Sequence, residues 1–196
     1  LAACRLEHLA DSLDEEQHWA QQLSGGEQQR IAIARALLHK PDWLRETFKD
    51  LREDLSEANA EDKRLLVMVE QRGCIYCTEM HEQVFPDPAI DALIRDHYFV
   101  VQMNLFGDVD VTDFDGTVLP EKDMAVRWGV VFTPTLIFLP EEVAEGATAS
   151  EAAVVSMPGA FGKATTEALL TWVNDHGYES GEHFQKFLAE RIDPQD

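Results

Sequence analysis

The spacing of apolar residues changes after the first quarter of the chain and predicts a helix followed by a buried strand. Over residues 48–58 the apolar positions recur three or four residues apart, which is typical of an amphipathic helix. These positions are Phe48, Leu51, Leu55 and Ala58. The almost wholly apolar run 65–69 follows, and a run of this kind predicts a central strand that is covered on both faces.

The remaining sequence continues this alternation. Helical spacing is found over 78–84, 88–96, 121–128 and 165–174, and strand patterns over 99–105, 135–139 and 152–157. The early strand-helix-strand order favours parallel pairing, because parallel strands need a crossover. The acidic stretch 140–151 is expected to be flexible, and 182–191 to add one or two helical turns. We therefore predict an α/β fold, with a central mixed sheet flanked by helices and an N-terminal helical appendage.

Composition and charge limit the possible partners. The 196 residues suffice for one domain of ordinary size, and 45% hydrophobic with 27% charged residues is typical of globular proteins. The longest apolar stretch, 129–139, is too short to cross a bilayer, so we expect a soluble protein. The net charge is −21 without a basic stripe, which makes nucleic acid and anionic membranes poor partners. A monomer is expected.

The first 44 residues differ in character from residues 45–196, and we treat the two parts as separate domains. Leu23-Ser24-Gly25-Gly26-Glu27-Gln28-Gln29-Arg30 runs directly into an apolar-periodic segment, and it resembles the signature loop and following helix of ABC-transporter ATPases. The resemblance ends at Leu44, and the chain has no G-x-x-x-x-G-K-[ST] loop to hold phosphates. We expect a non-functional helical fragment. The alternative is a remnant nucleotide-dependent regulator.

Two cysteines mark the expected start of a helix that follows the first strand, in the order Cys74-Ile75-Tyr76-Cys77. A cysteine at a helix N-terminus faces the positive end of the helix dipole, which lowers its pKa below about 8.5 and favours the nucleophilic thiolate. Cys74 is therefore the expected attacking sulfur and should be reached by solvent. Cys77 lies one turn deeper, should be shielded, and can resolve a mixed disulfide.

A Thr133-Pro134 dipeptide begins a later strand, at a position where proline costs no ladder hydrogen bond. Together with the C-x-x-C motif, it makes residues 46–175 resemble the thioredoxin superfamily. The flanking residues resemble thioredoxin-related proteins of the SoxW type; they are Glu70-Gln71-x-Gly73, residues 111–116 and Trp128-Gly129-Val130. The chain starts without a signal peptide, which favours a cytoplasmic location, whereas the SoxW resemblance implies the periplasm.

The resemblance implies a thiol-disulfide oxidoreductase that acts on protein disulfides and takes electrons from an unknown donor, without a cofactor. It also implies a cis peptide bond before Pro134, which places the Thr133 backbone beside the sulfurs. Ile75, Tyr76 and Thr133 are expected to contact the substrate. The alternative function is a redox-silent module that binds partners through the groove beside Pro134.

Three further positions leave alternatives open. Met68 replaces the carboxylate that serves as proton acceptor in thioredoxins; Glu70, on the same strand face, is either its substitute or a solvated strand-end residue. His81 follows Cys77 by one helical turn and could stabilise a thiolate or bind a metal, or it could be an exposed histidine. A zinc site would lack a fourth ligand, because the third cysteine, Cys4, lies in the N-terminal fragment, where we expect a free thiol. No metal site is predicted.

An acidic loop, 107–116, carries four aspartates, namely Asp108, Asp110, Asp113 and Asp115. An EF-hand would need a carboxylate where Val111 stands and a glutamate where Lys122 stands. We therefore expect a solvated loop here, with a calcium site as the alternative.

Overall fold

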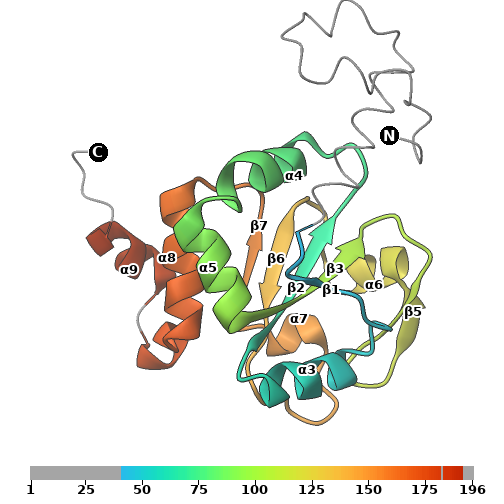
Figure 1. Cartoon of the computed structure of the whole chain (residues 1–196). Helices are drawn as coiled ribbons and strands as arrows, with labels where there is room; N and C mark the ends of the chain where they lie inside the picture. Colours follow the sequence, from blue (N-terminus) through green and yellow to red (C-terminus); the bar gives the residue numbers. More distant parts are fainter. Residues whose placement is uncertain (1–40, 182, 192–196) are drawn as a thin grey trace, which may run out of the picture. The chain divides into compact units, whose positions relative to one another are not determined.

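A computed structural model describes residues 41–181 and 183–191 of the chain (Figure 1). The chain divides into two units, Leu1–Asp42 and Trp43–Asp196, and every element named below belongs to the second. The expectations for the ABC-like motif and for Cys4 fall on residues outside the described part. In the described part, no helix is both long enough and apolar enough to cross a membrane.

A five-stranded mixed sheet forms the centre of the second unit, in the order β1-β3-β2-β6-β7. Its strands are β1 (Leu44–Arg45), β2 (Arg64–Glu70), β3 (Tyr98–Asn104), β6 (Thr135–Phe138) and β7 (Val155–Pro158). Strands β1, β3 and β2 run parallel, with Leu66 opposite Val100, while β6 pairs antiparallel with both β2 and β7. The α/β fold with a mixed sheet is therefore as predicted.

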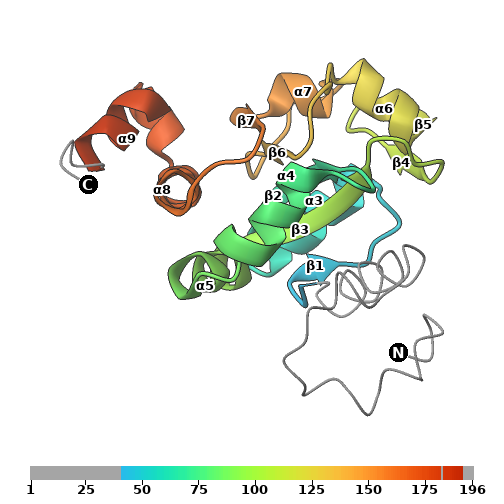
Figure 2. The same ribbon diagram turned by 90° about the horizontal axis from the view of Figure 1, so that it is seen from above.

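Helices cover both faces of this sheet (Figures 1 and 2). One face packs against α3 (Leu51–Ala60), α6 (Glu121–Arg127) and α7 (Ala149–Ala152). The other packs against α4 (Ile75–Glu79), its π-helical continuation η3 (Met80–Val84), α5 (Pro88–His97) and α8 (Lys163–Asn174). The short 3-10 helix η4 (Gly177–Ser180) and α9 (Phe184–Arg191) follow α8. Alternate residues of β2 point to opposite faces, so the buried apolar run supplies both cores.

The start of the chain's second unit differs from the sequence expectation. Helix α3 begins at Leu51, with the Asp50 side chain accepting a hydrogen bond from the backbone of Arg52. Phe48 lies outside the helix and is 95% exposed, so its assignment to the apolar face was wrong. The reason is the left-handed backbone of Lys49, with φ of 58°, which turns the chain away before the helix starts. The predicted boundary between residues 44 and 45 also divides β1, which pairs with β3.

The stretch 140–151 and the strand expected over 152–157 need a second correction. Residues 149–152 form α7, whose N-terminus has a reciprocal cap between Thr148 and Glu151. The strand β7 therefore begins only at Val155. Short helices of this kind escape a search for periodicity because one turn contains too few residues to repeat.

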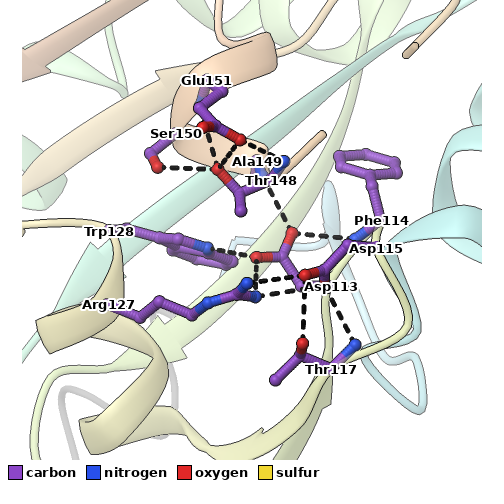
Figure 3. A network of polar contacts seen from close by, with 10 residues as sticks. All are labelled: Asp113, Phe114, Asp115, Thr117, Arg127, Trp128, Thr148, Ala149, Ser150 and Glu151. Atoms are coloured by element: carbon purple, nitrogen blue, oxygen red, sulfur yellow. Dashed lines mark hydrogen bonds and ion pairs between the residues drawn. The ribbon is translucent and has the colours of Figure 1, made fainter. Parts of the chain in front are cut away.

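The acidic loop is more ordered than expected. β4 (Asp110–Thr112), within the loop, pairs antiparallel with β5 (Val118–Pro120), which follows it, and Asp113, between the two strands, is fully buried (Figure 3). Asp113 accepts hydrogen bonds from the Phe114 and Ala149 backbones at 2.8 Å, from Trp128 Nε1 at 2.8 Å and from Arg127 Nη1 at 2.9 Å. The expectation of a solvated loop was therefore wrong for Asp113.

The neighbouring Asp115 also pairs with the Arg127 guanidinium, through contacts of 2.6 and 3.1 Å (Figure 3). The hydrogen bond from Arg127 holds the pKa of the Asp115 carboxyl well below its usual range. The cation that these two aspartates bind is thus the side chain of Arg127. The network joins the β4–β5 pair to the end of α6 and to the start of α7.

Candidate active site

Cys74 and Cys77 lie at the start of α4 and are joined by a disulfide. Cys74 is the N-cap residue, and its Sγ accepts a hydrogen bond from the Cys77 backbone N–H at 3.0 Å. Gly73 precedes it with φ of 78°, a left-handed conformation that lets the chain turn from β2 into the helix. The first cysteine therefore begins the helix, as the sequence indicated.

Thr133 lies beside Cys74 although it is 59 residues away in sequence. The Thr133 hydroxyl donates to Cys74 Sγ at 3.4 Å, and the Thr133 carbonyl oxygen lies 3.5 Å from the same sulfur. The Thr133–Pro134 peptide bond is cis, and the Pro134 carbonyl accepts from Gly159 N–H at 2.7 Å. The structure thus brings together Cys74, Cys77, Thr133 and Pro134.

The expected difference in exposure between the two cysteines is absent. Cys74 and Cys77 are each 6% exposed. Thr133 accounts for the low exposure of Cys74, because both its hydroxyl and its carbonyl oxygen lie against that sulfur. The two sulfurs are therefore distinguished by their hydrogen bonds and by their place in the helix rather than by solvent access.

Large apolar side chains are exposed between the two cysteines and directly before the Thr133-Pro134 pair. Ile75 and Tyr76, between the cysteines, are 79% and 63% exposed. Val131 and Phe132, directly before Thr133, are 72% and 65% exposed. The last two were missed by the sequence analysis, although two bulky apolar residues directly before the Thr-Pro pair were a visible signal. Exposed apolar side chains of this size are suited to contact with another polypeptide.

Glu70, at the end of β2, forms a polar group with Gln102 of β3 and His81 of η3, which continues the helix α4 that starts with the cysteines. It is 7% exposed and accepts from Gln102 Nε2 at 2.5 Å. His81 Nε2 lies 2.9 and 3.1 Å from the two Glu70 oxygens. The alternative of a solvated strand-end glutamate was therefore wrong, since β3 and η3 cover this end of β2.

His81 is not the exposed helix histidine that sequence spacing also allowed. Its side chain is 20% exposed and stacks on Trp43, with ring centroids 6.4 Å apart and an interplanar angle of 12°. Phe85 contacts the ring edge-on at 5.2 Å. Trp43 was missed because it lies two residues before the predicted domain boundary. Among the described residues, no group of three His, Cys, Asp or Glu side chains is arranged to hold a metal ion.

Comparison with known families places this arrangement in context. Residues 51–170 match the model of the thioredoxin-like domain family, and the chain belongs to that family. The matched range includes both cysteines, Glu70, His81 and the Thr133-Pro134 pair.

Two solved structures share the fold. A thioredoxin-fold protein from Helicobacter pylori is 14% identical with a TM-score of 0.54, over 66% of this chain and 84% of that one. A thioredoxin from Thermus thermophilus is 25% identical with a TM-score of 0.51, over 68% of this chain and 90% of that one. These similarities establish the thioredoxin fold for this chain.

A separate, short similarity concerns an ATP-binding protein. An uncharacterized ABC transporter ATP-binding protein from Haemophilus influenzae is 60% identical over 37 residues, which make up 19% of this chain and 6% of that protein. The chain therefore spans only a small part of this relative's length.

Proposed function

We propose that this protein is a thiol-disulfide oxidoreductase of the SoxW-type thioredoxin-related kind, which exchanges disulfides in other proteins through Cys74 and Cys77. The observation that carries the proposal is the pair of donors at Cys74 Sγ, the Cys77 backbone N–H at 3.0 Å and the Thr133 hydroxyl at 3.4 Å. After reduction, the same donors would stabilise a thiolate at Cys74 and so favour attack by this sulfur.

The reaction proceeds in two exchanges. The Cys74 thiolate attacks one sulfur of a substrate disulfide, a Cys74–substrate bond forms, and the other substrate sulfur leaves as a thiolate that takes a proton from solvent. Cys77 then loses its proton and attacks Cys74 Sγ, so that the Cys74–Cys77 bond forms and the second substrate thiolate is released. The substrate gains two electrons, and an external dithiol of unknown identity must supply two electrons to reduce the Cys74–Cys77 disulfide again.

The Thr133–Pro134 segment and the exposed apolar side chains support a protein substrate. Thr133 presents its backbone beside Cys74 Sγ, where an extended substrate chain can pair with it. Ile75 and Tyr76, between the cysteines, offer apolar contact, as do Val131 and Phe132 directly before Thr133. The flanking residues 111–116 and 128–130 support the SoxW type; in the structure, Asp113 and Trp128 from these two segments bind each other.

Trapping distinguishes this function from a redox-silent binding module. In a Cys4→Ser background, the Cys77→Ser variant should retain the attacking sulfur but lack the resolving one, so a mixed disulfide with a model protein disulfide should persist until external thiol is added. The Cys74→Ser variant should form none.

Alkylation followed by mass spectrometry in glutathione buffers of graded potential provides the matching measurement for the unsubstituted protein. Cys74 and Cys77 should switch together between the dithiol and the disulfide as the potential changes. A binding module would keep one redox state across the range and trap no substrate, and trapping through Cys77 alone would reverse the assigned order.

A further inference from the structure

We infer that His81 is the base that takes the proton from Cys77 during the second exchange, and that Glu70 is a positioning residue that orients His81. This inference rests on the proposed oxidoreductase function and deepens it. It also revises the sequence-based expectation that Glu70 itself replaces the acceptor missing at Met68.

The hydrogen bonds of Glu70 argue against a direct role as proton acceptor. One oxygen lies 2.9 Å from His81 Nε2; the second lies 3.1 Å from the same nitrogen and 2.5 Å from Gln102 Nε2. A carboxylate only accepts hydrogen bonds, so His81 Nε2 must carry a hydrogen in this arrangement. Both Glu70 oxygens are thus already engaged by donors and turned toward His81 and Gln102.

The same hydrogen bonds set the state of the other ring nitrogen. When Nε2 carries the hydrogen of a neutral imidazole, Nδ1 holds a free lone pair and can accept a proton. His81 Nδ1 is buried and has no hydrogen-bond partner among the described residues. A buried polar atom without a partner is rare in folded proteins and calls for an explanation, of which a catalytic role is one. His81 therefore offers one unoccupied basic atom, in the disulfide form of the protein.

His81 lies on the same side of the helix as Cys77, although its Nδ1 makes no hydrogen bond to Cys77 Sγ in the disulfide form. The two residues are four positions apart, and side chains on a helix lean back over the residue about one turn earlier. Both belong to the inner side of the cysteine helix, since Cys77 is 6% exposed and the imidazole reaches the buried Glu70. The helix widens into the π-helical turn η3 from Met80 onward, a feature frequent at functional sites.

The surroundings hold the imidazole in one orientation and leave few charges near it. Trp43, directly before β1, stacks on the ring, Phe85 contacts its edge, and Gln102 from β3 is neutral. Arg45, the charged residue of β1, lies over Phe99 on the opposite face of the sheet, and Glu79 and Glu82 of the cysteine helix are exposed. Glu70 is the carboxylate that His81 contacts.

The resulting order, a sulfur, a histidine and a carboxylate, follows the logic of a nucleophile activated by an oriented base. In the second exchange the Cys77 S–H proton passes to His81 Nδ1, and the imidazolium is stabilised by Glu70. The Cys77 thiolate attacks Cys74 Sγ, the new disulfide forms, and the substrate thiolate departs. His81 then returns its proton to solvent or to the departing thiolate.

The role of His81 can be tested with a reagent that reports the two exchanges separately. In the full-length Cys4→Ser protein, reduced Cys74 attacks dithiobis(nitrobenzoate) and releases one coloured thiolate, and resolution by Cys77 releases the second. The His81→Gln variant should leave the first release within about twofold and slow the second by roughly a hundredfold near neutral pH, at the low end of what a positioned base contributes. The variant's second rate should climb steeply with pH toward the unsubstituted rate, because solvent then removes the proton.

Two further variants separate this role from a merely structural one. His81→Phe keeps a ring between Trp43 and Phe85 but has no basic nitrogen, and it should repeat the kinetics of His81→Gln. His97→Gln, a histidine in the last turn of α5, should change neither rate. The Glu70→Gln, His81→Gln double variant should resolve no more slowly than His81→Gln alone, because Glu70 acts through His81.

The outcomes that overturn the inference differ from those that overturn the proposed function. Equal second rates in His81→Gln and the unsubstituted protein, equal slowing of both releases, or additive effects in the double variant would each refute the role of His81. Absence of a second release from the unsubstituted protein would instead refute the oxidoreductase itself.

Discussion

Trp43 and Leu44 should be required by the thioredoxin-like unit, whereas residues 1–40 should not be. Trp43 and Leu44 are 6% and 7% exposed and belong to the core on the α5 and α8 face of the sheet. Leu44 also pairs with Val100 in β3, and Trp43 stacks on His81. Two variant chains, one beginning at Pro41 and one beginning at Arg45, differ only by this short segment.

The size of the effect follows from the side chains that are lost. Removing a buried Trp costs about 3–5 kcal/mol and a buried Leu about 2–5 kcal/mol. Because the segment is at one end of the unit, its neighbours can partly relax, and we take about 5 kcal/mol for the sum. For a domain of this size, 1 kcal/mol corresponds to about 2–4 °C in Tm, so the chain beginning at Arg45 should melt about 10–20 °C lower.

Thermal unfolding of the oxidised chains, followed by circular dichroism, gives this difference directly. The two-step thiolate release should also respond, with the second release slowed in the chain that lacks Trp43, because His81 loses its stacking partner. Trp43→Ala in the chain beginning at Pro41 is the matched control and should account for more than half of the loss. Equal Tm values for the two truncated chains would refute the reasoning, and failure of the Pro41 chain to fold would show that residues 1–40 are needed as well.

Four other substitutions test the packing in the rest of the thioredoxin-like unit. Burial raises the pKa of Asp54 from 3.8 to about 6, so the folded state holds this proton more tightly than the unfolded state. Asp54→Asn should therefore raise the free energy of unfolding at pH 7 by up to about 3 kcal/mol and add nothing at pH 3.5. Equal gains in urea titrations at the two pH values would contradict this. Asp113→Asn should cost about 3–5 kcal/mol by the same titration, since an amide cannot accept all four hydrogen bonds and leaves Arg127 without its buried partner. Phe48→Ser should change stability by less than about 0.5 kcal/mol, whereas Leu51→Ala should cost about 2–5 kcal/mol, and similar losses would restore Phe48 to the core.

The sequence predicted β2 and β3 at the centre of the sheet well because both are long, largely apolar runs that alternate with helices. β2 is buried along its whole length, and β3 nearly so. Such runs can be recognised in the sequence without knowledge of the contacts they make. The short elements were missed for the opposite reason. β1 has two residues and β4 has three, so each is defined by its pairing with a distant strand rather than by a pattern of its own.

The features of the site also fall into local signals, which the sequence showed, and long-range contacts, which it did not. The cysteine pair at a helix start and the Thr-Pro pair at a strand start are local signals, and the structure brings both pairs together. The contacts of Glu70 with His81 and Gln102 span 11 and 32 residues, so spacing on one helix or one strand could suggest candidates but not their pairing. Trp43 could not be assigned to the site because its surrounding sequence resembles another family.

The antiparallel course of β6 explains why these local signals meet. Strand β2 ends at Glu70 and leads within four residues to Cys74, so the cysteines lie beyond the carboxyl end of β2. β6 runs in the opposite direction, and its first residue, Thr135, lies opposite Val69. The residues directly before β6 must therefore lie at the same edge of the sheet as Cys74. A parallel β6 would place Thr133 at the other end of β2, about 20 Å away at the usual rise per residue. The direction of one strand thus brings Cys74 and the Thr133-Pro134 segment, for which we propose the roles of attacking sulfur and substrate-binding segment, into a single site.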